Sequence, residues 1–331
     1  MVLVKKYNAN GLYIASTIKK PSINKSKHAL EWAKTANRIL ESFSYMQEFS
    51  GETFVIKCDG QIMKNPSRAK QFAEDLVLIK KSGINPIVVY CDECQTDKIL
   101  KNIKVESTFA GKSLSKGISK NTYNMAISGM FNKEIVTLIN SSGGMAVGIS
   151  GKDGGMIEAK KSVINVNVPN SNIEKIIDLG FLGEPTRINP ILLQELSGSN
   201  IIPVISPIGL GANGETLILN ADLVAAYIAA SVAAEKLIII SYAPHIFTKD
   251  GNKIAKLSFS EAIKLMEQKN ISMEIIRKID TCIYALKNDC GTAHILDGSL
   301  PNILAMAIFT DLPSGTAIYS DSSKYSLEIN L

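Results

Sequence analysis

Short apolar runs alternate with amphipathic helical segments along most of this 331-residue chain. This alternation is typical of an α/β fold, in which helices cover both faces of a central, mostly parallel sheet. The predicted strands are 53–56, 87–89, 146–149, 163–168, 201–205, 237–240 and 293–296. The predicted helices, from apolar residues at helical spacing, are 66–81, 121–140, 221–234, 260–268 and 274–287.

Two parts of the chain depart from the alternation. Residues 1–25 are rich in Lys, Asn and Ser and show little periodicity, which predicts a mobile arm. Apolar residues then recur at helical spacing over 29–43, where Trp32 is the only Trp of the chain. This helix either packs on its own core or docks on another subunit. The glycine-spaced segments 183–188 and 209–219 predict hairpins laid over the sheet.

Composition and charge exclude several classes of protein. Lys and Arg outnumber Asp and Glu by only 36 to 31, and no basic block is interleaved with aromatic residues. Nucleic-acid binding therefore has no support, whereas a small anionic substrate is compatible. The sequence has neither a signal-peptide pattern nor an apolar stretch long enough to span a bilayer, so we expect a cytoplasmic protein without membrane contact. Five cysteines suit a reducing compartment.

Polar residues at strand ends are the first candidates for a site, because ligands of open parallel sheets bind at the carboxyl ends of strands. Lys57 ends the first strand and Gly60 follows it, and a turn with free N–H groups beside an ammonium forms an anion site. Asn220 and Asp222 stand at the start of a predicted helix. They are either helix caps or, for Asp222, a carboxylate that holds lysines facing a phosphoryl group. Lys278 is either one of these lysines or a surface charge.

Eight separated segments follow the order found in the amino acid kinase family, across about residues 43–316. They are YMQEFSGETFVIK, VLIKKSGINPIVV, NKEIV, AVGISGKDGG, DLGFLGEP, IIPVISPIG, GETLILNAD and AHILDG. The chain most resembles the acetylglutamate kinase branch of that family. The resemblance implies an αβα sandwich over 46–331, with an amino-acid-substrate lobe at about 46–206 and a nucleotide lobe at about 207–331. Residues 1–45 would be the arm and an oligomerisation helix.

The resemblance also implies a reaction. ATP, with Mg²⁺ bound, would phosphorylate the side-chain carboxylate of N-acetyl-L-glutamate in arginine biosynthesis. Lys57 and Lys278 match the two family lysines that neutralise the transferring group, and Asp222 matches the aspartate that organises them. The implied substrate-binding residues are Asn220, Gly60, Asp92, Glu93 and Ser113, and the implied nucleotide-binding residues are Lys57, Gly60, Ser241, Tyr242 and Lys278.

Assembly and regulation are further implications of the resemblance. The helix at 29–43 resembles one that interlaces dimers into a ring-shaped hexamer in arginine-inhibited members, so a homo-hexamer or a homodimer is expected. His294, Gly298 and Gly315 match part of the arginine effector site of those members. Ala307, however, stands where arginine-binding members usually carry a glutamate, which removes one expected partner of a cationic ligand.

The departures from the family pattern gather where phosphates should bind. Residues 90–94, YCDEC, stand where the family has a histidine, three glycines and a proline, and Gln95 matches the glutamine that follows. Every loop glycine that lets N–H groups approach a phosphate is therefore lost. Asp59 replaces one glycine of a pair, Met273 and Glu274 replace another pair, and Ser113 replaces a substrate-binding arginine. Two readings therefore stay open: a working kinase, or a relative that keeps the fold for assembly or ligand binding without catalysis.

The CxxC motif in that loop has a third reading. If the strands at 54–56 and 88–89 are neighbours, as the resemblance implies, Cys58, Cys91 and Cys94 converge at one sheet edge. Three thiolates and a nearby carboxylate would suit zinc. The alternative is that these cysteines are small apolar residues in an altered phosphate loop.

Overall fold

The computed structural model describes residues 2–7, 13–18, 25–91, 120–167, 174–242, 246, 253–268, 271–310 and 315–321. The chain forms two compact units, Met1–Ser44 and Tyr45–Leu331. Within the described ranges, no helix combines the length and apolar character needed to cross a bilayer.

The first unit contains an antiparallel strand pair and most of a long helix. Strand β1 (Val2–Tyr7) pairs with β2 (Tyr13–Ile18), and helix α1 (Lys25–Glu48) follows. The sequence analysis predicts no strands here, because the apolar residues of these short strands are mixed with polar ones in a segment that shows little periodicity. Trp32 on α1 is 72 % exposed.

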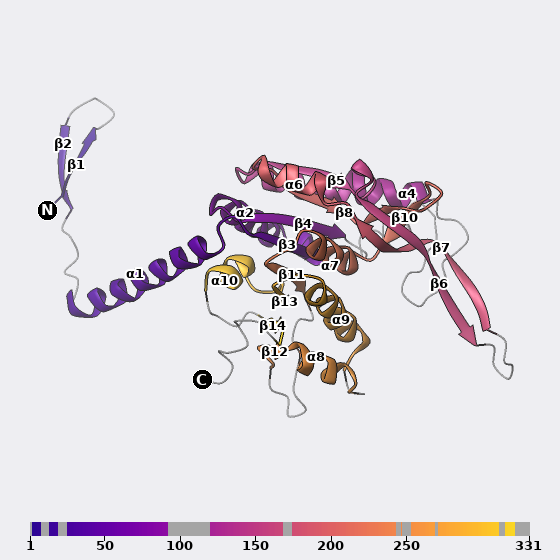
Figure 1. Cartoon of the computed structure of the whole chain (residues 1–331). Coiled ribbons are helices and arrows are strands. Elements are labelled where there is room, and N and C mark those ends of the chain that lie inside the picture. The colour runs from indigo at the N-terminus through magenta and orange to yellow at the C-terminus, as the bar shows by residue number, and fades with distance from the viewer. Residues whose placement is uncertain are drawn as a thin grey trace. The chain divides into compact units, whose positions relative to one another are not determined.

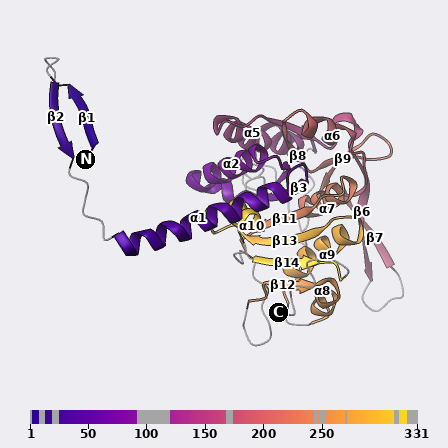
Figure 2. The ribbon, with the colours of Figure 1, turned by 60° about the vertical axis from the view of Figure 1, so that its left-hand side comes forward.

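The second unit is built on an eight-stranded sheet (Figure 1). In sheet order its strands are β12 (Lys256–Ser258), β14 (Gly315–Tyr319), β13 (Thr292–Asp297), β11 (Lys236–Ser241), β3 (Thr53–Asp59), β4 (Asn85–Cys91), β8 (Ile202–Ser206) and β5 (Ala146–Ser150). Strands β13 and β14 pair antiparallel, and the other neighbours pair in parallel. Figure 2 shows β3, β11, β13, β14 and β12 side by side. The predicted mostly parallel sheet is confirmed.

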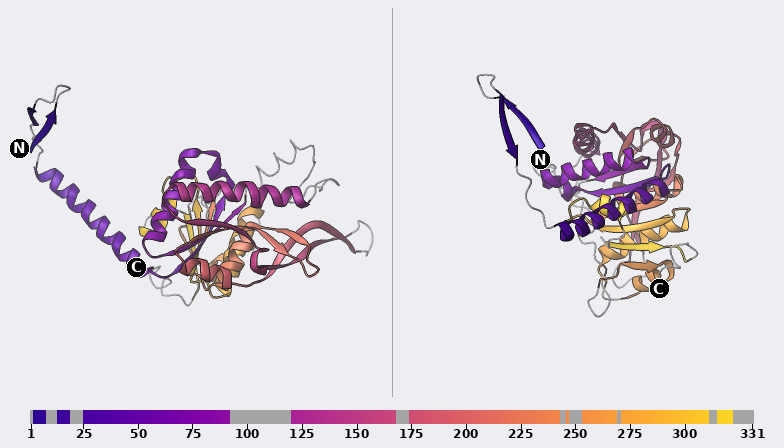
Figure 3. Two further views of the ribbon diagram at one scale, coloured as in Figure 1. Left: turned by 90° about the horizontal axis from the view of Figure 1, so that it is seen from above. Right: turned by 90° about the vertical axis from the view of Figure 1, so that its left-hand side faces the viewer.

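Helices cover both faces of this sheet (Figure 3). Phe54 and Ile56 of β3 join one buried apolar cluster with residues of α2, α5 and α10, while Val55 joins a second cluster with residues of α7, α8 and α9. Alternate side chains of a strand point to opposite faces, so a strand buried on both sides contributes to two cores. The helices are α2 (Pro66–Lys81), α4 (Lys120–Asn124), α5 (Asn132–Ser141), α6 (Ile191–Gly198), α7 (Ala221–Ser231), α8 (Phe259–Met266), α9 (Met273–Lys287) and α10 (Ile303–Phe309), with the π-helix η2 (Met125–Phe131) between α4 and α5 and the short 3-10 helices η1 (Gly60–Lys64) and η3 (Asp153–Gly155).

Local sequence explains where several helices begin and end. Helix α2 begins at Pro66, and the Asn65 side chain before it accepts the N–H groups of Ser67 and Arg68. Helix α7 ends before the predicted residue 234, because Ala233 has a left-handed φ of 47°. The predicted helix at 121–140 is observed as α4, η2 and α5 in succession.

A second, four-stranded sheet closes on itself beside the first. Its strands are β6 (Ile157–Asn167), β7 (Glu174–Ile188), β9 (Ile208–Leu210) and β10 (Thr216–Leu219). The predicted hairpin at 209–219 is confirmed as the β9–β10 pair. Two predictions are wrong. Of the run predicted at 163–168, residues 163–167 belong to β6 rather than to the main sheet, and residue 168 lies outside the described residues. Residues 183–188 are the end of β7 rather than a hairpin.

The buried side chain of Asp75 links α2 to α10 by a hydrogen bond. Asp75 is 6 % exposed, and its Oδ2 accepts the N–H of Ala305 at 3.4 Å. Burial raises the pKa of Asp75 from 3.8 to about 6, although the N–H groups of Ala305 and Leu304 act in the opposite direction. Because the pKa is raised in the folded chain, the protonated acid favours folding. This stabilisation is complete below about pH 4 and is lost as the pH rises through about 6.

We expect Asp75→Asn to raise the free energy of unfolding at about pH 7 by on the order of 2 kcal/mol, because an amide keeps the acceptor and removes the buried charge. Urea unfolding at several pH values measures this effect. The variant should also lose the fall in stability between about pH 4 and 6. Asp280→Asn, at an exposed position of α9, is the matched control. Equal pH dependence of Asp75→Asn and the unmodified protein would contradict the assignment.

Candidate active site

The structure brings Lys57 and Asp222 together at the carboxyl edge of the main sheet. Lys57 lies near the end of β3, level with Ile239 of the parallel neighbour β11. Its Nζ is 2.9 Å from Oδ1 of Asp222, and the two side chains are 13 % and 17 % exposed. A largely buried carboxylate in this position fixes the ammonium at one point, where it can face an anionic group at the edge.

Asn220 rather than Asp222 caps helix α7, which leaves the Asp222 carboxylate to pair with Lys57. Asn220 ends the preceding strand region, and its Oδ1 accepts the N–H of Leu223 at 3.0 Å, so Asn220 caps the helix. Asp222 follows in the first turn, where the helix dipole favours a negative charge. Asn220 is thus a helix cap, and Asp222 contacts Lys57. A role of this pair at a phosphoryl group remains a prediction.

Lys278 lies on the buried face of α9. Its side chain is 9 % exposed, and Nζ is 2.5 Å from Oε1 of Glu274, one turn earlier in the helix. Helix α9 leads into β13, which is parallel to β11, so its N-terminal end lies at the carboxyl edge of these strands. One turn later, Cys282 is buried; its burial, with a contribution from the Asp222 carboxylate, raises the pKa of its thiol. This face of α9 therefore looks toward α7, but the contact described for Lys278 is with Glu274.

The turn after β3 carries its own carboxylate. Oδ1 of Asp59 accepts the N–H of Gln61 at 2.9 Å and so caps η1. Gly60, the first residue of η1, is buried. An N–H group at such a turn would otherwise be available to a phosphate oxygen. Here the Asp59 carboxylate, rather than a phosphate, accepts the N–H of Gln61.

The end of β11 and the residue after it, Tyr242, pack against neighbouring segments. Ser241 is 1 % exposed, and its carbonyl oxygen accepts the N–H of Gly298 at 2.9 Å. The ring of Tyr242 lies against Gly298, where an added Cβ would stand 2.9 Å from Cε2 of the ring. Burial raises the pKa of Tyr242, and the nearby Arg68 lowers it to a smaller extent. Asp92, Glu93 and Ser113, predicted to bind the substrate, lie outside the described residues.

The three residues predicted for an arginine effector site lie on β13 and β14 or just after β13. His294 is half-buried, its Nε2 is 3.2 Å from Oγ1 of Thr292, and burial together with Lys236 lowers its pKa to about 3. Its imidazole is therefore neutral at physiological pH. A Cβ on Gly315 would stand 1.9 Å from the carbonyl oxygen of Ile295, so the strand pairing itself requires glycine. The effector role of these residues remains a prediction.

One of the three cysteines considered as zinc ligands, Cys58, lies in the apolar core. Cys58 is fully buried in the same apolar cluster as Phe54 and Ile56. Cys94 and the side chain of Cys91 lie outside the described residues. Among the residues that the structure does describe, no three His, Cys, Asp or Glu side chains are grouped in a way that suits a metal ion.

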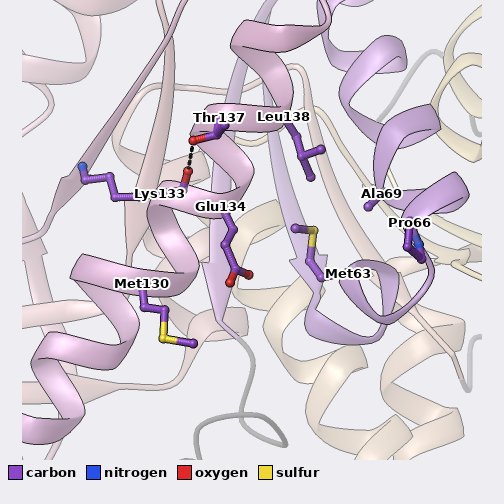
Figure 4. A pocket seen from close by; sticks show the side chains of 8 residues that line it. All are labelled: Met63, Pro66, Ala69, Met130, Lys133, Glu134, Thr137 and Leu138. Atoms are coloured by element: carbon purple, nitrogen blue, oxygen red, sulfur yellow. Dashed lines mark hydrogen bonds between the residues drawn. The ribbon is translucent and has the colours of Figure 1, made fainter.

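Sequence reasoning missed two contacts and one pocket. The pairing of Glu274 with Lys278 follows an i, i+4 spacing, which is the signal that could have revealed it. Asp59 precedes the N–H that it caps by two residues, a spacing typical of such turns. An open pocket of about 510 Å³ lies between η1–α2 and η2–α5 (Figure 4) and contains none of the predicted site residues. Its lining residues are Met63, Pro66, Ala69, Met130, Lys133, Glu134, Thr137 and Leu138.

Comparison with known proteins gives concordant results from sequence and structure. Residues 52–297 match the model of the amino acid kinase family. An acetylglutamate kinase from Ehrlichia chaffeensis is 41 % identical over 87 % of this chain and 90 % of its own length, and one from Rhodospirillum rubrum is 41 % identical over 87 % and 93 %. The fold is similar to that of N-acetylglutamate synthase from Neisseria gonorrhoeae (TM-score 0.72, 21 % identity, 87 % of this chain and 64 % of that one) and of carbamate kinase from Giardia (TM-score 0.60, 15 % identity, 82 % and 99 %).

Proposed function

Because this chain belongs to the amino acid kinase family, we propose that it is an acetylglutamate kinase. It transfers the terminal phosphoryl group of ATP, supplied with Mg²⁺, to the side-chain carboxylate of N-acetyl-L-glutamate. The observation that carries the substrate assignment is the high identity to proteins of that name over nearly their full length. The ion pair between Lys57 and Asp222 supports the same reaction class.

The proposed chemistry asks little of the protein beyond positioning and charge. The acceptor carboxylate is ionised at neutral pH, because the ordinary pKa of a glutamate side chain is about 4.3, so no general base is needed. Negative charge on the transferring phosphoryl group must be neutralised. We assign this role to Lys57, which Asp222 holds at 2.9 Å, and to Lys278 as a second cation. Mg²⁺ travels with the phosphates of the substrate and balances further charge.

The remaining assignments are part of the same proposal. Asn220 and Gly60 contact the amino-acid substrate, and Gly60, Ser241 and Tyr242 line the nucleotide site. The lobe at about 46–206 binds N-acetylglutamate, and the lobe at about 207–331 binds ATP. The helix at 29–43 joins copies of the chain into a homodimer or homo-hexamer in the cytoplasm, in the arginine biosynthesis pathway.

A coupled assay that follows ADP release from MgATP and N-acetyl-L-glutamate tests the proposal. Trapping the product with hydroxylamine identifies the acyl phosphate, and unacetylated glutamate serves as the control substrate. We expect ADP release that depends on N-acetylglutamate and exceeds that of the Lys57→Ala variant. Equal rates for the two proteins would contradict the kinase assignment.

A second candidate is a relative that binds ligands without catalysis. Two observations favour it: Glu274 contacts Lys278, and Asp59 occupies the N–H of Gln61. Both place carboxylates on groups that a phosphate would use. Calorimetry with MgATP separates this candidate from a protein with no nucleotide site, since ligand binding would persist in the absence of ADP release.

A further inference from the structure

We propose that Glu274 is a positioning residue that competes with the nucleotide phosphates for Lys278. In the free protein, the Glu274 carboxylate holds the lysine. When MgATP binds, a phosphate oxygen replaces that carboxylate, and Lys278 becomes available to the reaction. The inference rests on the proposed function, because Lys278 is assigned there as a phosphate-facing cation.

The two side chains of the ion pair differ in their exposure to solvent. Lys278 is 9 % exposed, whereas Glu274 is 58 % exposed. Nζ of Lys278 and Oε1 of Glu274 are 2.5 Å apart. Glu274 is thus the solvent-facing member, and an anion that approaches the ammonium from solvent meets the Glu274 carboxylate first.

Because both are negatively charged, the Glu274 carboxylate and a nucleotide phosphate largely exclude each other from the Lys278 ammonium. A lysine ammonium has three donors, so a phosphate and a carboxylate can both reach it. The two anions would then lie side by side, and like charges at contact distance repel strongly unless a cation separates them. Glu274 has a flexible side chain in the first turn of α9. The preceding Ser272 caps this helix, because its hydroxyl oxygen accepts the N–H of Ile275. It can turn to solvent at little cost, because pairs involving a half-exposed partner are weak.

The same contact has a purely structural reading, in which Glu274 only supports the helix. A glutamate one turn before a lysine stabilises helices in general, and it complements the helix dipole. Removing it would then lower the stability of α9 slightly without changing nucleotide affinity. The two readings therefore predict different binding results for the same variant.

The decisive variant is Glu274→Gln in the full-length protein. Calorimetry with MgATP and with adenosine, and the KM for MgATP at saturating N-acetylglutamate, give the readouts. We expect the Kd and KM for MgATP to fall about two- to fivefold, the range for a half-exposed ion pair, while adenosine binding stays unchanged because it carries no phosphate. Most of this gain should disappear at about 0.5 M salt, where exposed charges are screened.

Glu74→Gln is the matched control. Glu74 pairs with Lys70 at the same helical spacing on α2, with both side chains half-exposed or more. It should leave MgATP affinity unchanged. A Kd for MgATP in Glu274→Gln that is equal to or higher than that of the unmodified protein would overturn the inference, as would an equal gain for adenosine.

The outcomes separate this inference from the proposed function. Tighter MgATP binding by Glu274→Gln, with no turnover by either protein, supports the competition and rejects the kinase assignment. Turnover by both proteins with equal MgATP affinity rejects the competition and leaves the assignment intact. Absence of MgATP binding by both proteins rejects both.

Discussion

Lys57→Ala lowers kcat by about 10²- to 10³-fold in the acetylglutamate kinase assay, if Lys57 neutralises the transferring phosphoryl group as proposed. This is the usual loss when one positioned charge or donor at a transition state is removed. The ammonium is held by Asp222 at 2.9 Å, and both side chains are mostly buried, so water replaces it poorly. Initial rates at saturating MgATP and N-acetylglutamate measure the effect as a change in kcat.

The control for this prediction is Lys70→Ala. Lys70 also pairs with a carboxylate, Glu74, but its side chain is 70 % exposed, so its loss should leave kcat unchanged. Asp222→Asn gives a second comparison, since Lys57 remains but its holder loses charge, and an intermediate loss is expected. A Lys57→Ala protein that is folded and keeps more than about a tenth of kcat would remove Lys57 from the chemistry.

Gly315→Ala lowers the free energy of unfolding by about 3 kcal/mol, because the added methyl group has no space. Its Cβ would stand 1.9 Å from the carbonyl oxygen of Ile295 and 2.9 Å from Cα of Leu296. Both obstacles are backbone atoms of β13, to which β14 pairs at Leu296 and Gly315. A rotamer change cannot relieve such a contact, so the two strands must move apart.

Urea unfolding measures this loss, with Gly129→Ala as the control. An added Cβ on Gly129 meets no atom within 4 Å, and alanine suits its helical backbone, so stability should stay equal or rise. Equal stability of Gly315→Ala and the unmodified protein would contradict the packing argument. The result also bears on the predicted arginine site, since a change in arginine response on replacing Gly315 is informative only if the strand pair survives.

The sequence was most informative where a local pattern and a buried position coincide. The sequence predicts a helix over 66–81, and α2 has the same bounds, because a proline in the first turn and the apolar spacing are local features. The strand and helix ends predict Lys57 and Asp222 as site residues, and the two side chains lie in contact. Parallel strands bring their carboxyl ends to one edge, so this kind of prediction needs no knowledge of exact packing.

Other features depended on partners far apart in the chain or on weak local patterns. The run at 163–168 resembles a strand in either sheet, and only its antiparallel pairing with β7 decides which one it joins. The N-terminal strand pair lacks a long apolar run, so periodicity did not reveal it. Helix α10 is short and is held partly by Asp75 of α2, a contact between residues distant in sequence.

By itself, the sequence determined the mostly parallel α/β sheet, most of its helices and the positions of Lys57, Asn220, Asp222 and Lys278 at the strand and helix ends, because hydrophobic period and capping chemistry are local properties. Only the tertiary structure decided which charges meet. It pairs Lys57 with Asp222 and Lys278 with Glu274, and it requires glycine at 315. Contact distance, burial and backbone clearance arise when the strands and helices pack, and no single segment encodes them.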